Sequence, residues 1–218
     1  MDNTMSDVTA QHPMPKSIVL FVVACIVVFG ALALYQGSTE FIIYTVMTIV
    51  EVVVVMVIHR RVGLPLHVLW LLAVWALLHL AGGTVHIDPE LTKEGNKNVL
   101  YALRLHSWLP RYDQIVHMFG FFSATLTCGH VLLRSVRPIS AAPDSMPKGY
   151  TAIIMCSMLA GMGLGALNEV AEFIITLIDE NNGVGGYENT GWDLVSNTVG
   201  AFAGGVLLHM SKASFRSH

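Results

Sequence analysis

Six stretches of predominantly apolar sequence, each close to 20 residues long, constrain this chain more than any other feature. About 20 apolar residues in an α-helix cross the hydrocarbon core of a bilayer. Lipid offers the backbone no hydrogen-bond partner, so each span must be helical. We place the spans at about residues 17–35, 39–59, 64–85, 112–133, 150–178 and 193–211. The predicted fold is all-α, a single polytopic domain over 17–211 of six transmembrane helices, with an N-terminal tail (1–16) and a C-terminal tail (212–218).

Composition supports a membrane protein and argues against two other classes. Charged residues make up 12% of the chain and hydrophobic residues 54%, whereas soluble domains carry about 25% charged residues. The 12 Lys and Arg are outnumbered by 15 Asp and Glu, so no nucleic-acid partner is expected. Disorder requires low hydrophobicity, so a disordered chain is not expected at 54% hydrophobic residues. The three cysteines lie in apolar runs without a CxxC pair, so neither a disulfide framework nor a thiolate metal site is expected.

The first apolar run has a second interpretation. It is about 19 residues long, whereas the apolar core of a cleavable signal peptide has about 7–15 residues. We therefore expect a transmembrane span. The Ala31-Leu32-Ala33 sequence resembles a cleavage site, which keeps a signal peptide open as an alternative.

The distribution of basic residues predicts the orientation. Eight of the 12 Lys and Arg flank one side of the predicted spans: Lys16, Arg60, Arg61, Arg134, Arg137, Lys148, Lys212 and Arg216. The opposite loops carry the acidic residues Glu40, Asp179, Glu180 and Glu188. By the positive-inside rule, both termini are cytoplasmic. The long segment 86–111 then lies outside, where 98–109 forms either a short surface helix or a plain loop. The Gly/Asn-rich segment 181–191 predicts a flexible turn.

Ionisable and amide side chains inside the spans gather at one depth. Such groups are costly in lipid and usually face a partner or a cavity. Three pairs share a helix face by their spacing of three or four residues: Asp113 with His117, Glu169 with Glu172, and Asp193 with Asn197. His79 and His86 stand near the end of the third span. At 1.5 Å per residue, these groups fall in the outer half of the membrane, so we predict one outward-facing polar site.

Several of these residues also have a purely structural interpretation. Asp113 and Asp193 stand at predicted helix N-termini, where a carboxylate caps backbone N–H groups. His86 fits a loop residue, His79 a core histidine and Asn197 an interhelical hydrogen-bond residue. Two glycine pairs, Gly161 with Gly165 and Gly200 with Gly204, predict that the fifth and sixth spans pack closely.

These motifs resemble those of a known family. His79-x-x-Gly82-Gly83, Asp113-x-x-x-His117, Glu169-x-x-Glu172 and Trp192-Asp193-x-x-x-Asn197-x-x-Gly200-Ala201 resemble the YjdF-like family of bacterial inner-membrane proteins. The last three are also similar to the wider VanZ-like group, although the Asp113–His117 spacing and the position of Glu172 only approximate its pattern. The resemblance implies a multi-pass protein of the bacterial inner membrane. It implies no established reaction for YjdF-like members, and a loose link to glycopeptide tolerance for VanZ-like ones.

Two functional hypotheses follow from the polar site. As a binding or transport module, it would hold a metal ion, another cation or a lipid head group, with a homo-oligomer supplying further spans. As a metal-dependent enzyme, it would act on a lipid or envelope substrate. His117, Glu172 and Asp193 would bind zinc, manganese or iron. Glu169 or Asp113 would act as general base on bound water, and Asn197, His79 and His86 would bind substrate.

A purely structural or assembly role is a third hypothesis, and a b-type haem protein is the fourth. It requires two histidines that face each other across the bundle. The outer candidates are His79 and His117, and the inner candidates are His67, His130 and His209.

Overall fold

The computed structural model describes residues 12–92, 98–136, 149–179 and 182–211. Within these ranges the chain forms six α-helices and two short 3-10 turns, with one isolated β-bridge between His86 and Val99. The helices are α1 (Lys16–Gln36), α2 (Thr39–Val62), α3 (Leu66–Thr84), α4 (Tyr112–Val136), α5 (Tyr150–Ile178) and α6 (Tyr187–Met210). The all-α prediction is therefore confirmed for the described residues.

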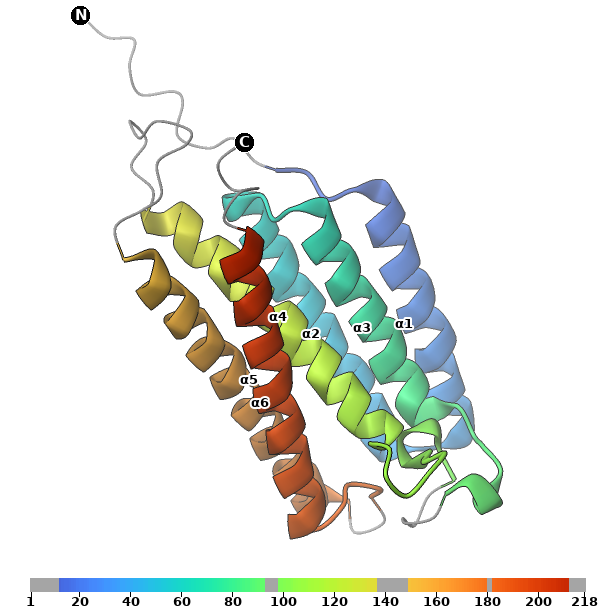
Figure 1. Cartoon of the computed structure of the whole chain (residues 1–218). Coiled ribbons are helices and arrows are strands. Elements are labelled where there is room, and N and C mark those ends of the chain that lie inside the picture. The colour runs from blue at the N-terminus through green and yellow to red at the C-terminus, as the bar shows by residue number, and fades with distance from the viewer. Residues whose placement is uncertain (1–11, 93–97, 137–148, 180–181, 212–218) are drawn as a thin grey trace, which may run out of the picture.

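The helices alternate in direction along one bundle (Figure 1). We call the end that carries residues 37–38, 85–92, 98–111 and 182–186 the site end. The start of α1 and the end of α6 lie together at the opposite end of the bundle (Figure 1). Their side of the membrane stays a prediction. Residues 1–11 and 212–218 of the predicted tails lie outside the described residues, as do Glu180, Arg137, Lys148, Lys212 and Arg216.

Five helices are long and apolar enough to cross a membrane: α1 to α5. Their outer faces expose large apolar side chains, such as Leu20, Val27 and Leu34 on α1. The sixth helix, α6, is less apolar, because its first half carries polar residues such as Asn189, Asp193 and Asn197. It nevertheless runs beside α4 and α5 through the bundle (Figure 1). The sixth transmembrane span therefore stays a prediction.

The largest difference from the sequence prediction is the start of α6. The helix begins at Tyr187, six residues before the predicted start at Asp193, and includes half of the segment expected to be a turn. Asp193 consequently lies in the second turn of α6 and is not an N-cap. Asp113 is the second residue of α4, so it is not an N-cap either, although a carboxylate in the first turn suits the helix dipole.

The long segment between α3 and α4 is mostly irregular. Of its two possible forms, the structure shows a loop with 3-10 turns at Pro89–Leu91 and Leu100–Ala102. No α-helix forms in its described part, 85–92 and 98–111. Two other connections reverse at Gly37 and Gly63, whose φ angles of 64° and 67° favour glycine.

Glycines set the spacing of the last three helices, but not in the predicted pairing. A Cβ at Gly165 would meet Asn197, so this α5 glycine faces α6 as expected. A Cβ at Gly200 would instead meet the backbone of Met118, and one at Gly204 would meet α4 too. Gly200 and Gly204 therefore allow close contact of α6 with α4, whereas Gly205 of α6 faces Met158 of α5.

Candidate metal and head-group site

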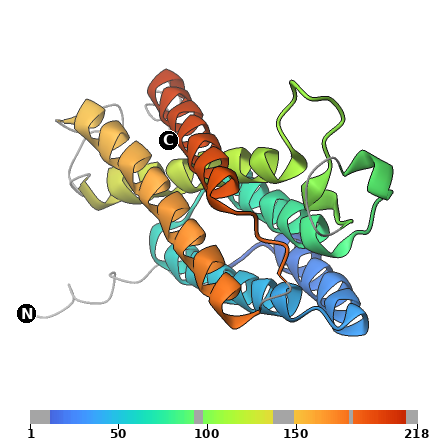
Figure 2. The ribbon, with the colours of Figure 1, turned by 90° about the horizontal axis from the view of Figure 1, so that it is seen from below.

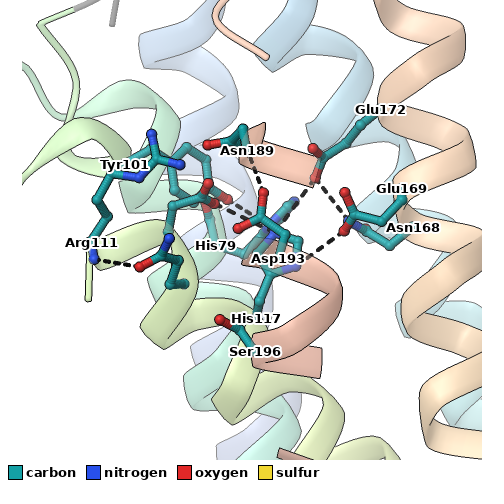
Figure 3. A network of polar contacts seen from close by, with 12 residues as sticks. His79, Tyr101, Arg111, His117, Asn168, Glu169, Glu172, Asn189, Asp193 and Ser196 are labelled. Carbon is teal, nitrogen blue, oxygen red and sulfur yellow. Dashed lines mark hydrogen bonds and ion pairs between the residues drawn. The ribbon is translucent and has the colours of Figure 1, made fainter. Parts of the chain in front are cut away.

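A buried imidazole and three carboxylates meet where α4, α5 and α6 approach each other (Figure 3). His117 is 7% exposed, Glu169 is 6% exposed and Asp193 is fully buried. Glu172, one turn beyond Glu169 on α5, is the fourth member. Each offers one ligand-type atom, and these atoms all lie within 4.8 Å of one another. We call these four residues the His–carboxylate cluster.

His117 is the centre of the cluster. Its Nδ1 lies 3.0 Å from Oδ1 of Asn197 and 3.4 Å from Oε1 of Glu169. On the other side of the ring, Nε2 lies 3.5 Å from Oδ1 of Asp113 and 3.6 Å from Oε1 of Glu172. The imidazole therefore has oxygen acceptors on both sides.

Asn197 determines which ring nitrogen of His117 carries hydrogen. Its Nδ2 donates to Oε1 of Glu169 at 3.4 Å, which turns the amide oxygen towards His117. An amide oxygen only accepts, so Nδ1 of His117 must be the donor in the 3.0 Å contact. In the neutral ring, the lone pair of Nε2 then faces the carboxylates of Asp113 and Glu172. A lone pair on Nε2 and two carboxylates all accept hydrogen bonds and none donates. Such groups lie close together when a proton or a metal ion is held between them.

Two carboxylate oxygens of the cluster lack a donor. Oε2 of Glu169 and Oδ1 of Asp193 are buried, and neither has a hydrogen-bond partner among the described residues. Other oxygens are held in place: Asn168 donates to Oε1 of Glu172 at 2.8 Å, and Asn189 donates to Oδ2 of Asp193. A buried polar atom without a partner costs about 1–3 kcal/mol, and more when it is charged. These two buried oxygens therefore need a proton or a metal ion as a partner.

A cavity of about 760 Å³ at the site end reaches this cluster. Asp113 and Glu172 line its wall, as do His79, Tyr101 and Arg111. The cavity is thus bordered by side chains from the long loop as well as from the helices. It is large enough to admit a polar group beside the cluster.

The two histidines assigned to substrate lie in different surroundings. His79 lines the cavity, and its Nδ1 lies 2.6 Å from the hydroxyl of Tyr101, which also donates to the carbonyl of His79 at 2.8 Å. His86 is exposed, lies 3.2 Å from Nε2 of Gln36 and does not line the cavity. The structure therefore brings His79 to the site and leaves His86 apart from it.

Four residues of the site were not identified from the sequence. Asn168 and Asn189 each stand four residues before the carboxylate that they contact, a spacing that could have revealed both. Glu40, buried at the start of α2, accepts a hydrogen bond from the backbone N–H of Gly183 at 2.8 Å. Figure 2 views the site end, where the segment between α5 and α6 passes towards α2. No local pattern predicts this contact.

Tyr101 is the fourth residue, brought over the site by the loop. Burial and the nearby carboxylate of Asp113 raise the pKa of Tyr101 well above its usual value. Its phenol therefore stays protonated and continues to donate to the backbone of His79.

The inner histidines pack against each other. The rings of His67 and His130 meet edge to face, with centroids 5.9 Å apart. Nδ1 of His130 also lies 2.8 Å from the carbonyl of Leu126 in its own helix. His67 is exposed and His130 is buried, and the haem hypothesis stays a prediction.

Fold and site together define a multi-pass helical membrane protein with a buried His–carboxylate cluster. The family described as "Predicted membrane protein (DUF2238)" matches residues 16–214, so the chain belongs to that family. The YjdF-like resemblance is consistent with this assignment, whereas the comparison shows no VanZ-like link. No curated protein and no solved structure matches the chain.

Proposed function

We propose that this protein binds one divalent metal ion in the His–carboxylate cluster. The observation that carries the proposal is the convergence of acceptors: Nε2 of His117 faces Asp113 and Glu172 at 3.5 and 3.6 Å. Two ligand atoms about 2.1 Å from a tetrahedral ion lie roughly 3.4 Å apart, which is close to the 3.6 Å between Nε2 of His117 and Oε1 of Glu172. His117, Glu172 and Asp193 are the proposed ligands, and Glu169 supplies a further carboxylate within reach.

The ligand types restrict the metal. One imidazole with several carboxylates suits zinc, manganese or iron(II). Asn197 would act on His117 from outside the coordination sphere, because its hydrogen bond to Nδ1 leaves Nε2 available to the ion. The predicted orientation would place the ion on the outer side of the bacterial inner membrane.

The cavity supports a second proposal, that the bound metal serves catalysis on a lipid or envelope substrate. A metal lowers the pKa of a bound water so that a neighbouring base can activate it. Of the two candidate bases, Asp113 lines the cavity and Glu169 does not. Asp113 is therefore the better placed base, and His79 is placed to contact the substrate.

Elemental analysis of the detergent-purified protein tests metal binding. We expect about one zinc, manganese or iron atom per chain, retained after dialysis. His117→Ala and Glu172→Gln should each remove it. His209→Ala is the matched control, because His209 is exposed near the far end of α6.

Size-exclusion chromatography of each variant separates loss of metal from loss of folding. A monodisperse wild-type protein that takes up none of the three metals would overturn the proposal. So would full metal content in a folded His117→Ala variant.

A further inference from the structure

The cavity lies where two helices move apart. At Gly200 the backbone of α6 approaches Met118 of α4 so closely that no Cβ would fit. Towards the site end the two helices diverge (Figure 1). The cavity occupies this region, with Asp113 and Met118 of α4 and Ser196 and Val199 of α6 in its wall. The crossing therefore closes the cavity at its inner end.

Part of the cavity wall is apolar and exposed. Trp108 is 73% exposed, Trp192 is 53% exposed and Val199 is 46% exposed, and all three line the cavity. Val199 lies on the outer face of α6, the kind of surface that contacts acyl chains in a membrane protein. Tryptophan is enriched at the level of lipid head groups. With α6 as the predicted sixth span, this side of the cavity would face lipid.

Two cations stand on the polar side. Arg104 is used by the loop itself, since its guanidinium donates to the carbonyls of Leu109 and Ser107 at 3.2 and 2.7 Å. Arg111 lines the cavity two residues before Asp113, and its guanidinium acts electrostatically on that carboxylate. Its backbone N–H donates to Oε1 of Gln114 at 2.9 Å. A guanidinium beside a metal ion is suited to bind a phosphate group.

We propose that the cavity binds the phosphate head group of a membrane lipid, which enters sideways between the N-terminal halves of α4 and α6. Arg111 pairs with the phosphate, and the acyl chains lie along Trp192 and Val199. The inference rests on the proposed metal, because the four carboxylates that line the cavity would otherwise repel an anion: Glu40, Asp113, Glu172 and Glu188.

Native mass spectrometry of the metal-loaded, full-length protein tests this. The probes are dioleoyl phosphatidic acid, dioleoylglycerol with the same chains but no phosphate, and sn-glycerol 3-phosphate with no chains. We expect wild-type protein to bind phosphatidic acid about tenfold or more tightly than either other probe. Arg111→Gln should lower that affinity about tenfold. Arg61→Gln, which removes an exposed charge at the opposite end of the bundle, should not.

Metal content measured on the same samples separates this inference from the proposed function. Arg111→Gln should keep its metal while losing its preference for phosphatidic acid. An unchanged preference in a metal-bound Arg111→Gln protein overturns the head-group inference and leaves the metal site intact. Equal binding of dioleoylglycerol overturns it as well. Tight binding of glycerol 3-phosphate would identify a soluble phosphate as the ligand and overturn entry from the membrane.

Discussion

Replacing Gly200 with alanine should push α4 and α6 apart. The His–carboxylate cluster, which both helices help to form, should be disturbed as a result. A Cβ at Gly200 would overlap the carbonyl oxygen of Met118 and approach its C and Cα atoms. These are backbone atoms of a helix, so no side-chain rotation relieves the overlap. Overpacking of this kind costs about 1–3 kcal/mol, and an immovable neighbour places the cost near the upper end.

Gly163 provides the matched control. It is exposed on α5, and a Cβ there would meet no atom within 4 Å. Replacing glycine with alanine in a helix interior stabilises the helix by about 1 kcal/mol, and this contribution is the same for both substitutions. The difference in free energy of unfolding between Gly200→Ala and Gly163→Ala therefore isolates the overlap with Met118.

Thermal unfolding in detergent, followed by size-exclusion chromatography, measures the difference. For a chain of this size, about 2–4 °C corresponds to each kcal/mol. A difference near 3 kcal/mol then predicts that Gly200→Ala melts roughly 6–12 °C below Gly163→Ala. Metal content should fall as well, because Asn197 lies one turn before Gly200. Equal melting temperatures for the two variants would refute the close crossing of α4 and α6.

Three further outcomes follow from single contacts. Asn197→Leu should weaken metal binding about 10–100-fold in a competition titration, because Nδ1 of His117 loses its fixed partner, and unchanged affinity would contradict the tautomer argument. The raised pKa of Tyr101 means that the folded state keeps a proton that the unfolded chain loses. Stability should therefore fall as pH rises above about 10, less steeply in Tyr101→Phe, and identical alkaline unfolding curves would count against its burial. Glu40→Ala should speed hydrogen exchange at the amide of Gly183 by about tenfold or more, and equal rates would show that the contact adds no protection.

The helices could be predicted because each apolar run carries its own signal. Spans 17–35 and 39–59 end within three residues of α1 and α2, and glycines mark both ends. The start of α6 was missed because Gly, Asn and Thr over 181–191 favour a turn locally. In the structure α6 nevertheless begins at Tyr187, and Asn189 in its first turn donates to Asp193 four residues later. That spacing is a local sign of a helix, and the turn-forming composition outweighed it in the prediction.

The membership of the site could be predicted in part. Helical rise alone places His117, Glu169, Glu172 and Asp193 at a similar depth, because alternating helices bring their polar ends to one side. The depth of a residue in the membrane does not show in which direction its side chain points around the helix axis. The contacts of Tyr101 and Glu40 depend on how two loops return over the bundle, and no spacing along the chain encodes that path.

The glycines connect the fold to the chemistry of the site. Short side chains such as those of Asp193 and Asn197 reach another helix only when the backbones are close. Gly165 leaves the space that Asn197 occupies, and Gly200 lets α6 meet α4 next to His117. The same close packing buries the carboxylates and removes them from water, so they need a cation more than exposed carboxylates would. The small residues that hold the helices together thus also create the demand for charge compensation that the proposed metal would meet.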